Sequence, residues 1–77
     1  MTETSAVLSL AAMEYGIRFC GVTKTKILNK DFLEISFSGK NILGFKKLLF
    51  RFFSLFREEE YILESGERVI VLLLEKE

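Results

Sequence analysis

The sequence predicts a small two-layer α+β domain, in which two helices cover one face of a four-stranded antiparallel sheet. Three observations lead to this fold class: polar and apolar residues alternate over some stretches, apolar residues recur with helical spacing over another, and glycines such as Gly16, Gly39 and Gly66 stand between the stretches or at a turn. The predicted order is helix-strand-strand-helix-strand-strand. A chain of 77 residues has room for one domain, spanning residues 1–77.

The first half of the chain predicts a helix followed by a β-hairpin. Residues 4–15 are rich in Ala, Leu and Met, which favour helices, and Gly16 stands where a helix often ends. Residues 17–28 contain many β-branched residues, as strands do, and residues 29–31 are typical of a tight turn. The alternation over residues 32–38 then predicts a partner strand with one face in water.

The second half predicts another helix and another hairpin. Apolar residues from 42 to 57 cover one broad arc of a helical wheel, so we expect an amphipathic helix that ends near Arg57. Residues 61–74 predict a hairpin that turns at residues 65–67. A helix that continues to Leu63 is the rival interpretation of the region before this turn.

The final strand indicates that the chain associates with itself. Val69–Leu74 is apolar on both faces, which is typical of a strand in the middle of a sheet that is covered on both sides. One helical layer covers only one side, so the second cover is most simply another copy of the chain. A short chain with Cys20 as its only cysteine and no histidine also lacks an internal disulfide and the commonest zinc ligand. We therefore expect a homo-oligomer, most simply a two-fold dimer.

Five residues are the predicted interface candidates. Leu43 and Phe50 fall beside the main apolar arc of the second helix, and a wider core is the alternative explanation for them. The other three, Val69, Val71 and Leu73, belong to the final strand. We expect these five side chains to lie at or near the interface between copies.

The residue content argues against an enzyme. A chain without histidine lacks Ser-His-Asp and Cys-His pairing and has no imidazole to act as a general base. We expect no catalytic residue, no metal site and no cofactor, and hence a non-enzymatic binding or assembly module. The longest apolar run, Val69–Leu74, is far too short to span a membrane, and one cysteine without an export signal favours a cytoplasmic location.

A nucleic-acid-binding protein is the alternative function. Basic residues predominate over residues 17–57, and acidic residues predominate over residues 58–77. The basic first hairpin, residues 23–40, carries side chains that could contact a phosphate backbone or stack on a base, namely Lys24, Lys26, Lys30, Lys40 and Phe32. The competing explanation is that lysines keep an edge strand from pairing with other edges.

One short stretch resembles a known peptide motif. Lys46–Phe53 is similar to the peptide that docks on DNA sliding clamps, Gln-x-x-Leu-x-x-Phe-Phe, because Leu49, Phe52 and Phe53 match while Lys46 replaces the glutamine. The resemblance implies a sliding clamp as a partner. These side chains are also needed for the core, whereas a clamp ligand must be exposed, so we do not expect that partner.

Overall fold

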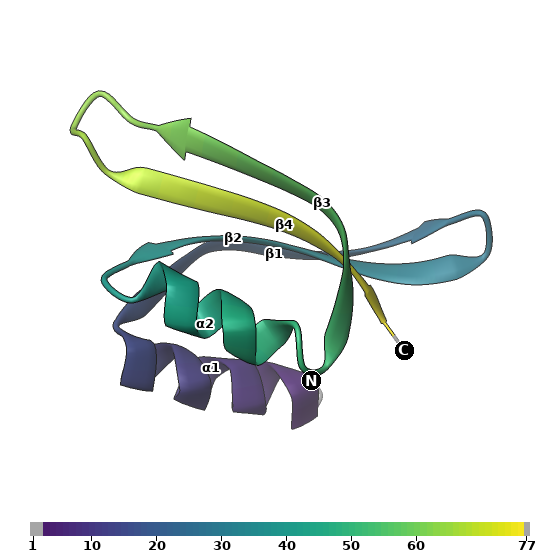
Figure 1. The fold of residues 1–77 in the computed structure, drawn as a ribbon. Coiled ribbons are helices and arrows are strands. Elements are labelled where there is room, and N and C mark those ends of the chain that lie inside the picture. The colour runs from purple at the N-terminus through teal and green to yellow at the C-terminus, as the bar shows by residue number, and fades with distance from the viewer. Residues whose placement is uncertain (1–2, 77) are drawn as a thin grey trace.

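The computed structural model describes residues 3–76, with side chains from Leu8 onward, and it confirms the predicted fold class (Figure 1). The elements are α1 (Glu3–Tyr15), β1 (Ile17–Ile27), β2 (Lys30–Gly39), α2 (Ile42–Leu49), β3 (Phe53–Ile62) and β4 (Arg68–Lys76). Residues 1, 2 and 77 of the predicted domain lie outside the described residues.

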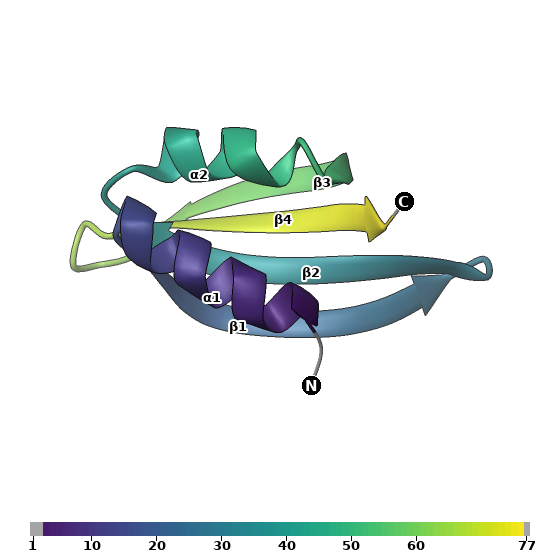
Figure 2. The same cartoon turned by 90° about the horizontal axis from the view of Figure 1, so that it is seen from below.

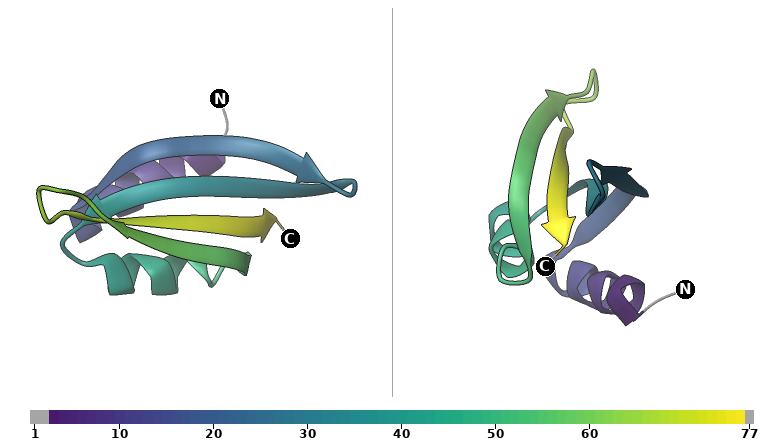
Figure 3. Two further views of the ribbon diagram at one scale, coloured as in Figure 1. Left: turned by 90° about the horizontal axis from the view of Figure 1, so that it is seen from above. Right: turned by 90° about the vertical axis from the view of Figure 1, so that its right-hand side faces the viewer.

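The four strands form one antiparallel sheet in the order β1-β2-β4-β3 (Figure 3). The apolar strand β4 therefore lies in the middle of the sheet, as its two apolar faces predicted. Both helices lie on one face of the sheet, which we call the helix face, and the opposite face is the open face (Figure 2). On the helix face Ile35 of β2 is paired with Leu72 of β4.

The core lies between the helices and the two central strands. These strands contribute Leu33, Ile35, Phe37, Ile70, Leu72 and Leu74. The ring of Phe45 on α2 packs edge-on against that of Phe37, with centroids 5.2 Å apart, and also meets the rings of Phe19 and Tyr15. Burial of each large apolar side chain contributes about 1.5–3 kcal/mol, so this cluster is the main source of the fold's stability.

The end of α1 is tied to the start of α2. The backbone N–H of Lys40 donates to the carbonyl of Gly16 over 3.3 Å. Gly39 lies so close to the same carbonyl that a Cβ atom there would overlap its oxygen. The Asn41 side chain then caps α2, because it accepts a hydrogen bond from the Gly44 N–H at 3.0 Å. The connection after β2 therefore positions both helices on the sheet.

The first hairpin turns one residue earlier than predicted. Leu28 and Asn29 form a two-residue loop with φ angles of 52° and 67°. Two positive φ angles are typical of a type I′ turn, whose twist matches that of the flanking strands. Asn29 tolerates this conformation, whereas Leu28 is strained in it, so the polar residues 29–31 were the more obvious turn.

The predicted helix to Arg57 is wrong, and so is the rival helix to Leu63. α2 ends at Leu49, tight turns follow over residues 50–52, and β3 begins at Phe53, well before the first strand of the predicted hairpin. The apolar residues after α2 fit a helical arc and a strand alike. Pairing with β4 along the whole of β3 decides for the strand, because it covers an edge of β4 that would otherwise be open.

Candidate interaction surfaces

The outer surface of α1 carries two large apolar side chains beside the exposed Ser9 and Glu14. Leu8 and Ala12 face the core, whereas Leu10 and Met13 point away from it and are 66% and 77% exposed. Large apolar side chains that face water are favourable sites for contact with another surface. The helix layer therefore presents two apolar side chains that the described part of the chain leaves uncovered.

The predicted interface residues near α2, Leu43 and Phe50, lie along the border between α2 and β3. Leu43 and Phe50 are both exposed. Lys46 follows Leu43 by three residues and precedes Phe50 by four, so the three side chains share one flank of the helix. Lys46 forms an ion pair with Glu58 of β3, which shows that this flank faces the β3 edge of the sheet.

The three candidates on β4 lie on the open face, but they differ in exposure. Val69 and Val71 are half-buried, whereas Leu73 is only 4% exposed. On the same face Phe32 packs edge to face against Phe56, with ring centroids 5.1 Å apart. Leu73 is therefore a core residue rather than a free interface residue, and the expectation that another copy must cover it is wrong. Val69 and Val71 stay accessible.

The basic hairpin does not bring its nucleic-acid candidates together. The register of β1 and β2 places Lys24 and Lys26 on the helix face but Lys30 on the open face. Lys40 lies in the connection between β2 and α2. Phe32 is 3% exposed, so its ring cannot stack on a base, and this candidate is corrected to a core residue.

The stretch similar to the sliding-clamp peptide is not presented as a ligand. Its Leu49 is fully buried in the core, and its Phe53 is partly buried against the core. Phe52 is exposed, but it lies in the turn between α2 and β3. Docking on a clamp would require Leu49 to leave the core.

The two edge strands differ in charge, and each contains a β-bulge. β1 contains only basic charged residues, whereas β3 contains Glu58–Glu60 beside Arg57. Register shifts mark the bulges at Cys20 in β1 and at Phe56 in β3. Bulges interrupt the pairing surface of an edge locally, and a run of like charges limits the pairing of that edge with an identical edge.

A buried hydroxyl connects the start of β1, the end of β2 and the turn before β4 at one end of the sheet. Ser38, 1% exposed at the end of β2, donates to Oε2 of Glu67 at 2.6 Å and accepts a hydrogen bond from Arg18 at 3.2 Å. Arg18 also forms an ion pair with Glu67. The hydrogen bonds from Ser38 and then from Arg18 lower the pKa of Glu67, and Glu67 raises the pKa of Arg18. Sequence reasoning missed this network because its members lie far apart in the chain.

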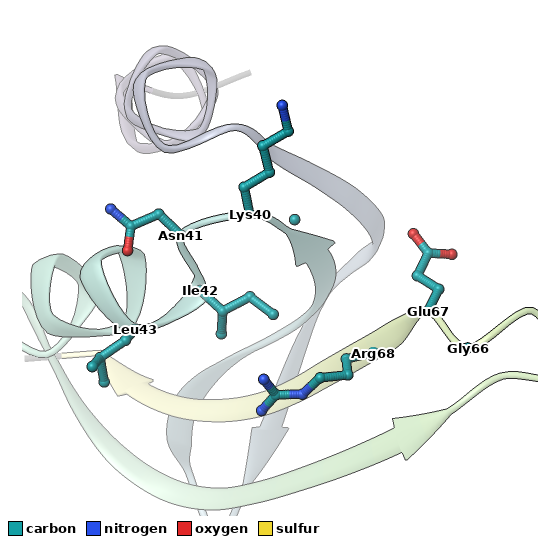
Figure 4. A pocket seen from close by; sticks show the side chains of 8 residues that line it. Lys40, Asn41, Ile42, Leu43, Gly66, Glu67 and Arg68 are labelled. Atoms are coloured by element: carbon teal, nitrogen blue, oxygen red, sulfur yellow. The ribbon is translucent and has the colours of Figure 1, made fainter.

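A hollow of about 510 Å³ lies where the β2–α2 connection meets the start of β4 (Figure 4). Its charged lining residues are Lys40, Glu67 and Arg68. Glu67 is paired with Arg18, and Arg68 is paired with Glu60. Two of the three charges are therefore neutralised within the chain, which leaves the hollow without a convergent set of groups for catalysis or for ligand binding.

Known proteins do not supply a function for these surfaces. Among the described side chains, no group of three or more His, Cys, Asp or Glu residues could hold a metal ion, and no helix within residues 3–76 is long and apolar enough to cross a membrane. Comparison with models of protein families, with curated proteins and with solved structures finds no match. The function has to be inferred from the chain's own surfaces.

Proposed function

We propose that this chain is a non-enzymatic assembly module that works as a homo-oligomer. The observation that supports it is the set of large apolar side chains that are more than half exposed: Leu10, Met13, Leu28, Leu43, Phe52, Phe56, Tyr61 and Ile62. Such surfaces in a small chain mark sites of protein–protein contact.

The lack of other stabilising devices in the chain supports the same proposal. Cys20 is the only cysteine, so no disulfide can form within one copy. A chain of this length buries only about 60% of its unfolded surface, and association is a general way to add burial. Leu10 and Met13 on α1 would gain from it, because both are large apolar side chains that are more than half exposed.

Gel filtration with light scattering tests the proposal. We expect a weight-average mass above 8.9 kDa that rises with concentration between about 1 µM and about 100 µM, as mass action requires. A mass of 8.9 kDa at every concentration would contradict it.

The nucleic-acid alternative has weaker support. Lys24 and Lys26 are exposed side by side on one edge, but Phe32 is buried and Lys30 lies on the other face. Titration of a labelled single strand and a labelled duplex at two salt concentrations separates the two functions. Binding that weakens steeply with salt would favour a phosphate-backbone contact, and no binding at low salt would remove this alternative.

A further inference from the structure

We infer that copies of this chain associate edge to edge, with the second half of β1 of one copy added antiparallel to the second half of β3 of the next. The inference rests on the proposed function and names the surface through which the homo-oligomer forms. The paired segments are residues 22–27 and 57–62, in the register that sets Lys24 opposite Glu60 and Lys26 opposite Glu58.

These two segments are the regular parts of the two edges. The bulge at Cys20 precedes the segment on β1, and the bulge at Phe56 precedes the segment on β3. Beyond each bulge the pairing with the inner neighbour is unbroken, so the strand keeps the regular geometry that another strand can join. Every residue of both segments is exposed, and neither segment contains proline.

The backbone of β1 offers its outward groups at alternate residues. In a two-residue hairpin the residues that flank the loop, here Ile27 and Lys30, form a hydrogen-bonded pair. The alternate residues Val22, Lys24 and Lys26 therefore direct their N–H and C=O groups away from β2, toward the edge.

The backbone of β3 offers its outward groups in matching positions. The N–H of Leu63 donates to the carbonyl of Glu67 on the β4 side over 2.9 Å. The direction of the backbone N–H and C=O groups alternates along β3. The backbone groups of Glu58, Glu60 and Ile62 therefore point away from β4. The proposed register sets outward residues of β1 against outward residues of β3, as a hydrogen-bonded antiparallel ladder requires.

The same register matches the side chains by face and by charge. Lys24 and Lys26 lie on the helix face, and so do Glu58 and Glu60. Each ammonium group therefore meets a carboxylate on the same side of the joined sheet, which stabilises a cross-strand pair.

Pairs of uncharged side chains across the joint also support this register. The exposed side chains of Val22 and Ile62 face each other at one end of the ladder. Pairing of two copies of β3 through Glu59 would instead set glutamates against glutamates, and like charges opposite each other are destabilising. Unlike edges are therefore the favoured partners.

Ion pairs within the chain leave room for this contact. Glu58 is paired with Lys46 and Glu60 with Arg68, each through Oε2, and Lys26 is paired with Asp31 over 3.7 Å. An ammonium group has three N–H donors, so this pair leaves Lys26 able to donate to a second carboxylate. A carboxylate has two oxygens and can accept several hydrogen bonds, and both glutamate side chains remain partly exposed.

The direction of the strands determines how copies would stack. β1 and β3 run in opposite directions, so a neighbour docks with its helices on the same side and extends one antiparallel sheet. Within one copy Val22 is level with Glu58 across the sheet, but in the joint it is level with Ile62, a shift of four residues or about 14 Å. Repetition of this heterologous step gives a ring or a filament, not the two-fold dimer expected from the sequence.

Charge reversal of each edge tests the inference, with mass from light scattering as the readout. Lys24→Glu with Lys26→Glu removes the basic edge, and Glu58→Lys with Glu60→Lys removes the acidic edge. We expect each variant alone to have the single-chain mass of 8.9 kDa and an equimolar mixture of the two to recover the wild-type mass. Circular dichroism of each variant checks that it is folded.

Two further variants keep the test decisive. Lys40→Glu with Lys76→Glu reverses two exposed lysines outside both segments and is expected to keep the wild-type mass. Lys24→Pro removes one outward donor without breaking a bond to β2, and it is expected to lower the mass to 8.9 kDa even if the glutamate reversal prevents folding.

The outcomes separate the inference from the proposed function. If the charge-reversed variants and Lys24→Pro keep the oligomeric mass of the wild type, edge pairing is overturned, the homo-oligomer stands, and another surface such as that of α1 forms it. A wild-type chain with a mass of 8.9 kDa throughout overturns both.

Discussion

At the scale of single residues, Glu67 accepts hydrogen bonds from the buried Ser38 hydroxyl and from Arg18. Both bonds favour the carboxylate and lower the pKa of Glu67 below its ordinary value of 4.5. The unfolded chain therefore binds a proton at Glu67 more readily than the folded chain. This group stabilises the fold above the unfolded pKa, and the contribution is lost as the pH falls through the folded pKa.

We predict that the free energy of unfolding decreases less steeply with falling pH in Glu67→Gln than in the wild type. Urea unfolding of the wild type and the variant between about pH 3 and about pH 6 measures the difference. The matched control is Glu64→Gln in the same turn, which is expected to keep the wild-type pH dependence. Equal slopes for the wild type and Glu67→Gln would contradict the role of the network.

Leu28 gives the second prediction at this scale. It adopts a φ of 52° in the type I′ turn, a conformation that costs an ordinary L-residue about 1–2 kcal/mol and that asparagine tolerates better. Leu28→Asn is therefore expected to raise the free energy of unfolding by about 0.5–1 kcal/mol. Leu63→Asn, another exposed leucine without a positive φ, should show no such gain when both are unfolded in urea at one protein concentration.

The sequence pattern predicted the exposure of some side chains correctly and that of others wrongly. Leu43 and Phe50 stand beside the apolar arc of α2, and both are exposed. The lysines around Phe32 predict a ring that is free to stack on a base, yet Phe56, from a segment predicted as helix, packs against that ring. The contact of Ser38 with Glu67 depends on how two hairpins meet, which local alternation does not encode.

At the scale of elements, the spacing of apolar residues and the turn residues between segments predicted the first helix, the first hairpin and the central position of β4. The same patterns failed between α2 and β3, because a segment rich in Phe and Leu fits both the helical repeat of about 3.6 residues and the strand repeat of two residues. The outcome depends on pairing with β4, which is a long-range contact. For the same reason the acidic and basic runs were visible in the sequence, but their placement on opposite edges was not.

Gly39 carries the prediction that belongs to this scale, because it joins the end of β2 to both helices. A Cβ atom there would overlap the Gly16 carbonyl oxygen and contact Ile17. Gly39→Ala is expected to lower the free energy of unfolding by about 1–3 kcal/mol. Gly21→Ala is the matched control, since a Cβ at that strand position meets nothing within 4 Å and should be neutral or slightly stabilising.

At the scale of the whole molecule, the fold hides one apolar layer and leaves other apolar groups in water. The helices and the inner strands enclose Phe37, Phe45 and Ile35 completely. Leu10 and Met13 on the outside of α1 remain exposed, and the charges of the two edges oppose each other. Pairing of the two edges would match their opposite charges, whereas Leu10 and Met13 would have to be covered by a separate contact.

Sedimentation equilibrium of the untagged wild-type chain tests this account most directly. We predict that the weight-average mass rises above 8.9 kDa as the concentration increases toward about 100 µM. We also predict that this mass falls again when added salt screens the charges of the two edge strands. A single ideal species of 8.9 kDa over the whole range would contradict it.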